Sequence, residues 1–325
     1  MISILPVQSY ASKHIEAVNK LIIESCGGES QLIEDIVNFI VSSGGKRVRP
    51  IFVYLCHNLC GKNDDNEDLV KASAVVELIH TASLLHDDII DEATKRRGKK
   101  TANTIWGNKE VILVGDFLFA KSFQIISSIK NIEIIQILSA ACLNLTRGEV
   151  MQLSARGEAI GESDYYNIIY SKTAALFEAS GKIGAIIANA EAEAVLQMGQ
   201  VGKNIGMAFQ IVDDILDYKP SSKTFGKKNG ADFFEGKTTL PVIFARQGSK
   251  ENSKKIETIF TQKLFTEENF AKTVAIMQSG QVFEKSGNVA KFFVANCTTT
   301  LNNFPPCKAR EHLFELISFF CERDF

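Results

Sequence analysis

Hydrophobic residues recur at intervals of three and four along most of this chain, a spacing that places them on one face of an α-helix. One run includes Val75, Leu78, Ile79 and Ala82, and a similar run spans residues 117–126. Strict alternation of apolar and polar residues, which indicates β-strands, is nearly absent. The pattern therefore predicts an all-α protein.

Proline placement indicates long helices. The six prolines are at positions 6, 50, 220, 241, 305 and 306, so residues 51–219 contain none. The expected breaks between helices are too short to be domain linkers. We expect a single domain spanning residues 1–325, a bundle of ten or more helices, in which residues 219–236 form a mobile loop after a helix.

Composition narrows the class of protein. The chain is 45% hydrophobic and 23% charged with a net charge of −2, as in ordinary soluble proteins. This balance gives no general attraction to nucleic acid, so any phosphate binding must come from local clusters of cations. The seven cysteines lack paired zinc-site spacing, and the first residues do not resemble a signal peptide. No apolar run approaches the roughly 20 residues of a membrane span. We expect a cytoplasmic protein.

The first chemically informative segment is LLHDDIIDEATKRRG, residues 84–98. Asp87 and Asp91 are four residues apart and share a helix face, with Asp88 beside them. Like charges at this spacing repel each other, and the neighbouring residues are apolar. A cation would relieve the repulsion, and oxygen ligands alone are what Mg²⁺ prefers.

A second segment, FQIVDDILDY, repeats this pattern with Asp213, Asp214 and Asp217. A single acidic triplet is more often a solvated helix face than a metal site. Two copies on apolar helices are poorly explained in that way. If they face each other across a helical bundle, they form a magnesium clamp that can hold a diphosphate.

Basic residues accompany both motifs. Any one of them alone is most simply a surface cation, but together they suggest an anionic, phosphate-containing substrate. They are Lys46, Arg47 and Arg49 in SGGKRVRP, Arg96 and Arg97 after the first motif, Lys172 beside Thr173, and Lys227 and Lys237 in or after the loop.

These motifs, in this order from about residue 20 to 250, resemble the trans-isoprenyl diphosphate synthase (polyprenyl synthetase) family. The shared segments include GGKRVRP, ELIHTASLLHDDIIDEATKRRG, GMAFQIVDDILDY and GADFFEGKTTLPVIFA. The resemblance implies the isoprenoid synthase type I fold, a helical bundle around a deep central cavity. It also implies a Mg²⁺-dependent prenyltransferase, with three magnesium ions when substrate is bound, that condenses isopentenyl diphosphate with farnesyl or geranylgeranyl diphosphate. Such enzymes are usually homodimers.

The resemblance also implies roles for individual residues. Asp87, Asp91 and Asp213 match metal ligands, and Asp88, Asp214 and Asp217 complete the catalytic motifs. Lys46, Arg49, His80 and Arg97 match the isopentenyl diphosphate site. Arg96, Lys172, Thr173, Gln210, Lys227 and Lys237 match the allylic diphosphate site, with Lys172 and Lys227 also catalytic. Taken alone, His80 would more often be a core residue.

Product length is predicted from Ala82 and Ser83, one helical turn before Asp87. In short-chain members of the family, bulky aromatic residues at these positions form a floor. Both residues are small here, so a tunnel that descends along the helix, which rises about 1.5 Å per residue, would admit a product of about C40. Such products commonly become quinone side chains.

Three alternatives stay open. Two are alternative functions, a short-chain (C15–C20) synthase and a non-catalytic partner subunit of a synthase, and the third is a partner interaction, a transient membrane contact for product release. The intact aspartates argue against the partner subunit. Residues from about 250 onward receive no catalytic role.

Overall fold

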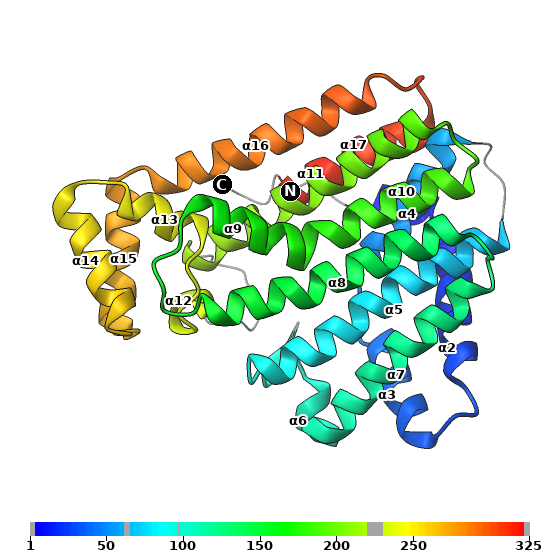
Figure 1. The fold of residues 1–325 in the computed structure, drawn as a ribbon, viewed down its shortest axis with the longest axis horizontal. Coiled ribbons are helices and arrows are strands. Elements are labelled where there is room, and N and C mark those ends of the chain that lie inside the picture. Colours follow the sequence, from blue (N-terminus) through cyan, green and yellow to red (C-terminus); the bar gives the residue numbers. More distant parts are fainter. Residues whose placement is uncertain (1–3, 62–65, 97, 220–229, 322–325) are drawn as a thin grey trace.

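The computed structural model describes residues 4–61, 66–96, 98–219 and 230–321, and this part of the chain is almost entirely helical (Figure 1). The predicted all-α fold with more than ten helices is confirmed. The first half contains α1 (Leu5–Tyr10), α2 (Ser12–Cys26), α3 (Gln31–Ser42), α4 (Val48–Cys60), α5 (Glu67–Ile90), a hairpin of β1 (Lys95–Arg96) and β2 (Lys99–Lys100), α6 (Ala102–Trp106), α7 (Asn108–Ser127) and α8 (Ile132–Ser154).

The second half begins with one long helical segment that is interrupted by a π-helical turn. Its elements are α9 (Glu162–Ile169), the π-turn η1 (Tyr170–Ala174), α10 (Ala175–Ile187), α11 (Ala192–Tyr218), α12 (Ala231–Phe234), α13 (Leu240–Arg246), α14 (Lys250–Thr261), α15 (Glu267–Ser279), α16 (Val282–Leu301) and α17 (Lys308–Cys321).

Several helices begin where the sequence supplies a capping side chain. The hydroxyl of Ser30 accepts a hydrogen bond from a backbone amide of α3, and Ser249 and Thr266 do the same for α14 and α15. Asn66 and Asn131 cap α5 and α8. Each cap satisfies a backbone donor that the helix itself leaves unpaired. The long helices therefore start at residues whose chemistry favours a start.

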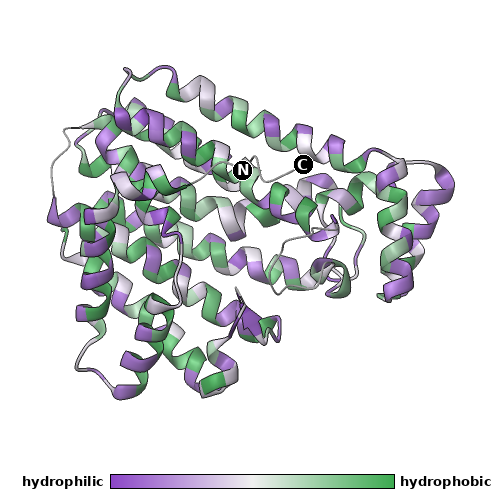
Figure 2. Cartoon of the chain, turned by 180° about the vertical axis from the view of Figure 1, so that it is seen from behind, coloured by the Kyte–Doolittle hydropathy of each residue, from purple (hydrophilic) through white to green (hydrophobic). Residues whose placement is uncertain are grey.

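The central helices α4, α5, α8, α10 and α11 position the site. Helix α10 packs against α11, α4 and α8, and α5 packs against α7 and α4. Hydrophobic and hydrophilic residues are interleaved along the long helices in Figure 2, as expected for helices with one buried face. Helices α5 (24 residues) and α11 (27 residues) lie within the stretch that lacks proline and carry the two aspartate motifs.

Helix α5 is long and apolar enough to cross a membrane by length and composition alone. In the described part of the chain it is the one helix that passes this test, and 61% of the relevant window is buried inside the bundle. A core helix of a soluble protein has the same composition, and α5 lies among α2, α4 and α7.

Helices α14 and α15 lie at one end of the molecule (Figure 1), and aromatic side chains from this region pack against α12. Phe233 of α12 is fully buried, and its ring centroid lies 6.0, 5.5 and 5.5 Å from those of Phe260, Phe265 and Phe270. These aromatic contacts hold the segment that carries Lys237. The region after residue 250, which received no role from sequence, thus supports one edge of the site.

Candidate active site

A cavity of about 860 Å³ opens between the central helices. Its walls include the start of α4, α5, α8, the π-turn, α10, α11 and residues 232–239. Both aspartate motifs contribute to this one space through Asp87, Asp91, Asp213 and Asp214. The expectation of a deep cavity between the helices that carry the two motifs is confirmed.

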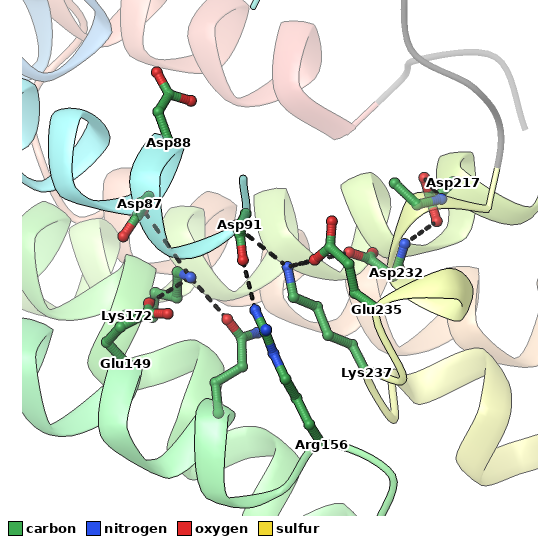
Figure 3. Close-up of polar contacts among 12 residues, drawn as sticks. Asp87, Asp88, Asp91, Glu149, Arg156, Lys172, Asp217, Asp232, Glu235 and Lys237 are labelled. Carbon is green, nitrogen blue, oxygen red and sulfur yellow. Dashed lines mark hydrogen bonds and ion pairs between the residues drawn. The ribbon is translucent and has the colours of Figure 1, made fainter. Parts of the chain in front are cut away.

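The three aspartates of the first motif do not share one role. Asp87 and Asp91 line the cavity, whereas Asp88 points away from them and is only 5% exposed (Figure 3). Its Oδ1 accepts from Nε and Nη2 of Arg96, each at 2.8 Å. Adjacent helical residues point about 100° apart, so Asp88 cannot share the face of its neighbours. Asp88 therefore holds Arg96, which also lines the cavity.

Asp91 forms ion pairs with two cations. Nη2 of Arg156 lies 2.6 Å from its Oδ1, and Nζ of Lys237 lies 3.6 Å from its Oδ2 (Figure 3). Arg156 follows the end of α8 and was not among the predicted site residues. No motif or spacing in the sequence distinguishes it from a surface arginine, so only its ion pair with Asp91 in the folded chain reveals it.

Burial raises the pKa of Asp87 to about 6, and the charges of Glu149 and Asp91 add to this rise, while Lys172 opposes it. Clustered carboxylates in a buried position thus make the ionised form of Asp87 costly. A divalent cation would remove that cost. This is the electrostatic condition that the sequence motif predicts for a metal-binding carboxylate.

Lys172 lies among the acidic residues of the same wall. Its Nζ is 4.0 Å from Oδ2 of Asp87, 2.5 Å from Oε2 of Glu149 and 2.7 Å from Oε1 of Gln152 (Figure 3). Glu149 and Gln152 were not assigned a role from sequence. Gln152 lines the cavity and Glu149 does not, and together they hold the ammonium group of Lys172 beside the first motif.

Lys172 and Thr173 lie in the π-helical turn η1, which the sequence did not predict. π-turns inside α-helices are frequently found at functional sites. Two glycines permit the close packing of this turn. A Cβ at Gly148 of α8 would lie 2.7 Å from the backbone nitrogen of Lys172, and one at Gly206 of α11 would collide with Ala174. The π-turn therefore lies between α8 and α11, and each of these helices approaches it closely at a glycine.

The aspartates of the second motif also differ in their exposure and hydrogen bonds. Asp213 is exposed in the cavity, whereas Asp214 is 3% exposed and accepts from Tyr165 Oη at 2.7 Å and Gln210 Nε2 at 2.8 Å. Burial, together with the charge of Asp232, raises the pKa of Asp214. Tyr165 was not predicted as a site residue. In this motif only Asp213 presents its carboxylate openly to the cavity.

Asp217 does not line the cavity. Its carboxylate accepts from the backbone amides of Ala231 at 3.2 Å and Asp232 at 2.9 Å, and so holds the start of α12 (Figure 3). The motif spacing placed Asp217 on the face of Asp213, but α11 ends one residue later and the chain folds back over it.

The three cations at the start of α4 take different positions. Arg47 is 8% exposed, adopts a left-handed backbone (φ 47°), and forms a buried ion pair with Glu77 at 2.8 Å. Arg49 lines the cavity, and burial lowers its pKa to about 10. Lys46 lines the same end of the cavity. Arg47 therefore lines the cavity but is held by Glu77, whereas Lys46 and Arg49 are the residues predicted to bind an anion.

The C-terminal helix α17 covers this end of the cavity. Lys46 Nζ lies 4.1 Å from the ring centroid of Phe319, and Phe320 lines the cavity. Arg49 packs on the ring of Phe177, at 4.5 Å from its centroid. His80, predicted for the same substrate, also lines the cavity. Phe319 and Phe320 were missed because aromatic residues of a terminal helix read as ordinary core positions.

Ser83 and Ala82 lie in different environments. Ser83 lines the cavity, as does Leu84. Ala82 does not. It is fully buried in a cluster that α5 shares with α2, α3 and α7. Ser83 is four residues before Asp87 and shares its face, whereas Ala82 is five residues before it and is rotated away. The expectation that both positions adjoin the tail therefore holds geometrically for Ser83 alone.

Of the remaining predicted residues, Thr173 and Gln210 line the cavity and are hydrogen-bonded to each other. Arg97 and Lys227 lie outside the described residues, as does most of the predicted loop 219–236.

The donor set suits magnesium. In the described ranges, no three Asp, Glu, His or Cys side chains converge as a preformed metal cage. Asp87, Asp91 and Asp213 nevertheless line one cavity with carboxylate oxygens. Mg²⁺ characteristically uses one or two carboxylates and completes its shell with water and substrate phosphates. The arrangement fits that mode of binding.

The helical bundle, its central cavity and the two aspartate motifs in the walls define the isoprenoid synthase type I fold. The polyprenyl synthetase family model matches residues 30–277, and the chain belongs to this family. It is 38% identical to octaprenyl diphosphate synthase of Escherichia coli (strain K12) over 258 residues, 79% of each chain. It is 34% identical to the Haemophilus influenzae protein of that name, over 100% of this chain and 98% of the relative. The structure of a decaprenyl diphosphate synthase from Rhodobacter capsulatus superimposes with a TM-score of 0.93, at 34% identity and 99% coverage of both chains.

Proposed function

We propose that this protein is a magnesium-dependent trans-prenyltransferase. It condenses isopentenyl diphosphate repeatedly with an allylic diphosphate, farnesyl or geranylgeranyl, to give an all-trans polyprenyl diphosphate near C40. The observation that carries the proposal is a single cavity that joins Asp87, Asp91 and Asp213 with the cations Arg49 and Lys172. The names of the long-chain relatives support the product class.

The two substrates bind at different parts of this cavity. The allylic diphosphate lies beside the aspartates, where Lys172, Thr173 and Gln210 line the wall and Arg96 and Lys237 flank it. Isopentenyl diphosphate binds near the start of α4, to Lys46, Arg49 and His80. The family resemblance assigns Arg97 to the isopentenyl diphosphate site and Lys227 to the allylic diphosphate site.

Asp87, Asp91 and Asp213 would hold the magnesium ions, three of them with substrate bound. When bound, the ions supply Lewis-acid stabilisation of the leaving diphosphate. The Lys172 ammonium and the Arg96 guanidinium add fixed positive charge to the same region, where negative charge grows as the bond breaks.

In the reaction, the allylic carbon–oxygen bond breaks and its electron pair leaves with diphosphate. The double bond of isopentenyl diphosphate supplies the electrons of the new carbon–carbon bond. A proton is then lost from the condensed product to the released diphosphate, which restores a double bond. No side-chain nucleophile is required. The cavity below Asp87 is walled by Leu84, Leu145 and Leu176, and these apolar side chains exclude water from the allylic cation.

The protein is proposed to act in the cytoplasm as a homodimer and to supply a chain for ubiquinone. An exposed apolar face of α8 supports the dimer. Ile132, Leu143 and Val150 are 68, 60 and 57% exposed, and their spacings of eleven and seven residues place them on one side of the helix. A second copy of the chain would cover this face. Release of a long product is proposed to involve transient contact with a membrane.

Purified protein with Mg²⁺, labelled isopentenyl diphosphate and farnesyl diphosphate should incorporate label into a chain near C40. Asp87→Asn should lose at least about a hundredfold in rate, because an amide cannot replace a charged ligand oxygen. Asp68→Asn, at the opposite end of α5, is the matched control and should retain activity. Absence of incorporation by the wild-type protein would refute the enzyme, and products of C15–C20 would refute the long-chain assignment.

A further inference from the structure

Tyr165 is a fully enclosed polar residue at the edge of the site. It lies on α9, is 2% exposed, and donates from Oη to Oδ2 of Asp214 at 2.7 Å. Burial and the charge of Asp214 raise the pKa of Tyr165 well above its usual value, so the hydroxyl keeps its proton. A buried hydroxyl that points at a carboxylate is a fixed donor.

The hydrogen bonds beyond Asp214 have a defined direction. Gln210 Nε2 donates to Oδ1 of Asp214 at 2.8 Å, so the amide oxygen of Gln210 must face the other way. That oxygen accepts from the Thr173 hydroxyl at 2.8 Å. The Tyr165 hydroxyl occupies Oδ2 of Asp214 and leaves Oδ1 to accept from Gln210, so the two residues together determine which end of the amide faces Asp214.

This orientation matters because Gln210 and Thr173 both line the cavity. With Nε2 held toward Asp214, the second N–H of that nitrogen is the group that Gln210 can offer to a ligand, whereas a flipped amide would offer its oxygen. Diphosphate oxygens only accept hydrogen bonds. The observed orientation is therefore the one that binds an anion.

We propose that Tyr165 is a positioning residue for the allylic diphosphate. Through Asp214 it fixes the Gln210 amide so that its N–H group is presented to the substrate. Tyr165 also lines the cavity, but its hydroxyl is committed to Asp214, so the effect of that hydroxyl passes through Asp214 and Gln210. The inference rests on the proposed prenyltransferase function and extends it to a residue outside the sequence motifs.

The chain contains a matched control on the next helical segment. Tyr170 Oη also donates to a carboxylate, Oε2 of Glu178 at 3.0 Å, but Glu178 does not line the cavity. Tyr170→Phe therefore removes a similar hydrogen bond without touching the amide of Gln210. Tyr170 is half-buried, and a general effect of deleting a tyrosine hydroxyl that donates to a carboxylate should appear in both variants.

The test measures the KM of each substrate separately in Tyr165→Phe and Tyr170→Phe. Tyr165→Phe should raise the KM for the allylic diphosphate about tenfold, the effect of one lost hydrogen bond to a charged group. The KM for isopentenyl diphosphate should change less than about twofold, because that substrate binds elsewhere. Tyr170→Phe should leave both values unchanged. Equal changes in both KM values, or none, would overturn the proposal.

A double-mutant cycle separates positioning from a structural effect. In a Gln210→Leu background, Tyr165→Phe should cause no further rise in the allylic KM, because the amide through which Tyr165 acts is gone. An additive further loss would show that Tyr165 acts by another route.

Two controls keep the result interpretable. If Tyr165→Phe does not fold, as judged by its thermal melt, Asp214→Asn replaces it. That variant keeps the side-chain shape but cannot accept from both Tyr165 and Gln210. At saturating Mg²⁺ it should still raise the KM for the allylic diphosphate more than the KM for isopentenyl diphosphate. Wild-type protein without activity would contradict the proposed function, whereas active wild-type protein with an unaltered variant would contradict only the role of Tyr165.

Discussion

Lys237 Nζ lies 3.6 Å from Oδ2 of Asp91, so a lysine that follows the second aspartate motif contacts the end of the first (Figure 3). The same nitrogen lies 3.7 Å from Asp232 and 2.5 Å from Glu235. Burial alone would lower the pKa of Lys237, but these carboxylates outweigh burial and raise it. Lys237 is therefore a permanent positive charge between the two walls of the cavity.

Replacing that charge should slow catalysis. We expect Lys237→Gln to lower kcat between about tenfold and a hundredfold, because one fixed charge near the leaving diphosphate is lost. Lys255→Gln removes an exposed lysine of α14 that pairs with Glu251 and should leave kcat unchanged. Steady-state rates at saturating substrate measure the effect. An unaltered kcat in Lys237→Gln would mean that this lysine only holds the segment in place.

Arg156 should compete with metal for Asp91. Its guanidinium lies 2.6 Å from the carboxylate, so metal binding at Asp91 must weaken this ion pair. A partly exposed pair contributes up to about 1 kcal/mol, so Arg156→Gln should lower the half-saturating Mg²⁺ concentration by up to about fivefold. Mg²⁺-induced thermal stabilisation measures this without activity.

The control for this prediction is Arg310→Gln, which removes a half-buried arginine that donates to the Phe304 carbonyl outside the cavity. It should not change the Mg²⁺ midpoint. A higher midpoint in Arg156→Gln would show that Arg156 assists metal or substrate binding rather than opposing it.

The helical fold and the cavity-facing aspartates could be predicted from sequence because both depend on local periodicity. A spacing of four residues places Asp87 and Asp91 on one face wherever the helix lies. Asp217 keeps the same spacing within α11, yet its carboxylate accepts from the backbone amide of Asp232 and does not line the cavity. Local spacing predicts a shared helix face, but not which contacts the rest of the chain makes with that face.

Residues that act through tertiary contacts left no comparable signal. Tyr165 and Arg156 become part of the site only because α9 packs beside α11 and the end of α8 approaches the end of α5. Arg47, next to two predicted anion-binding residues, lines the cavity with them but is paired with a buried carboxylate, Glu77. Sequence order does not encode which of these neighbouring cations is held by a buried carboxylate, because the loop conformation decides it.

His14 should make stability depend on pH. It is 5% exposed, its Nε2 lies 2.9 Å from Ser73 Oγ, and burial together with His57 lowers its pKa from 6.5 to about 4. Between these values the unfolded chain binds a proton that the native protein does not. Native stability should therefore fall as pH falls through this window, by about 3 kcal/mol in full.

Urea denaturation from pH 8 to 4.5 tests this. His14→Gln cannot take up the proton, so its stability should fall less steeply below pH 6.5 than that of the wild-type protein. Above pH 7 the difference between the two proteins should be constant. Parallel curves across the whole range would show that His14 does not contribute to acid sensitivity.

The proposed dimer can be broken on α8. Leu143 is 60% exposed, so Leu143→Glu should leave the fold of one chain intact while placing a charge in the middle of the interface. Light scattering after size exclusion should report a monomer at micromolar concentration. Leu196→Glu changes a leucine of α11 that is 61% exposed and should remain dimeric. A monomeric wild-type protein, or a dimeric Leu143→Glu variant, would contradict the assignment.

Product length should depend on Ser83 and not on Ala82. Ser83 lines the cavity four residues before Asp87, so Ser83→Phe would place a ring across the path of the growing tail and shorten the product. Ser83→Ala loses only a hydrogen bond to the His80 carbonyl and should keep the wild-type length. Ala82 is fully buried among apolar side chains, so Ala82→Phe should instead destabilise the fold by about 1–3 kcal/mol through overpacking. Mass spectrometry of the dephosphorylated products, together with thermal melts, separates these effects. An unchanged product length in a folded Ser83→Phe variant would show that the tail leaves the cavity along another wall.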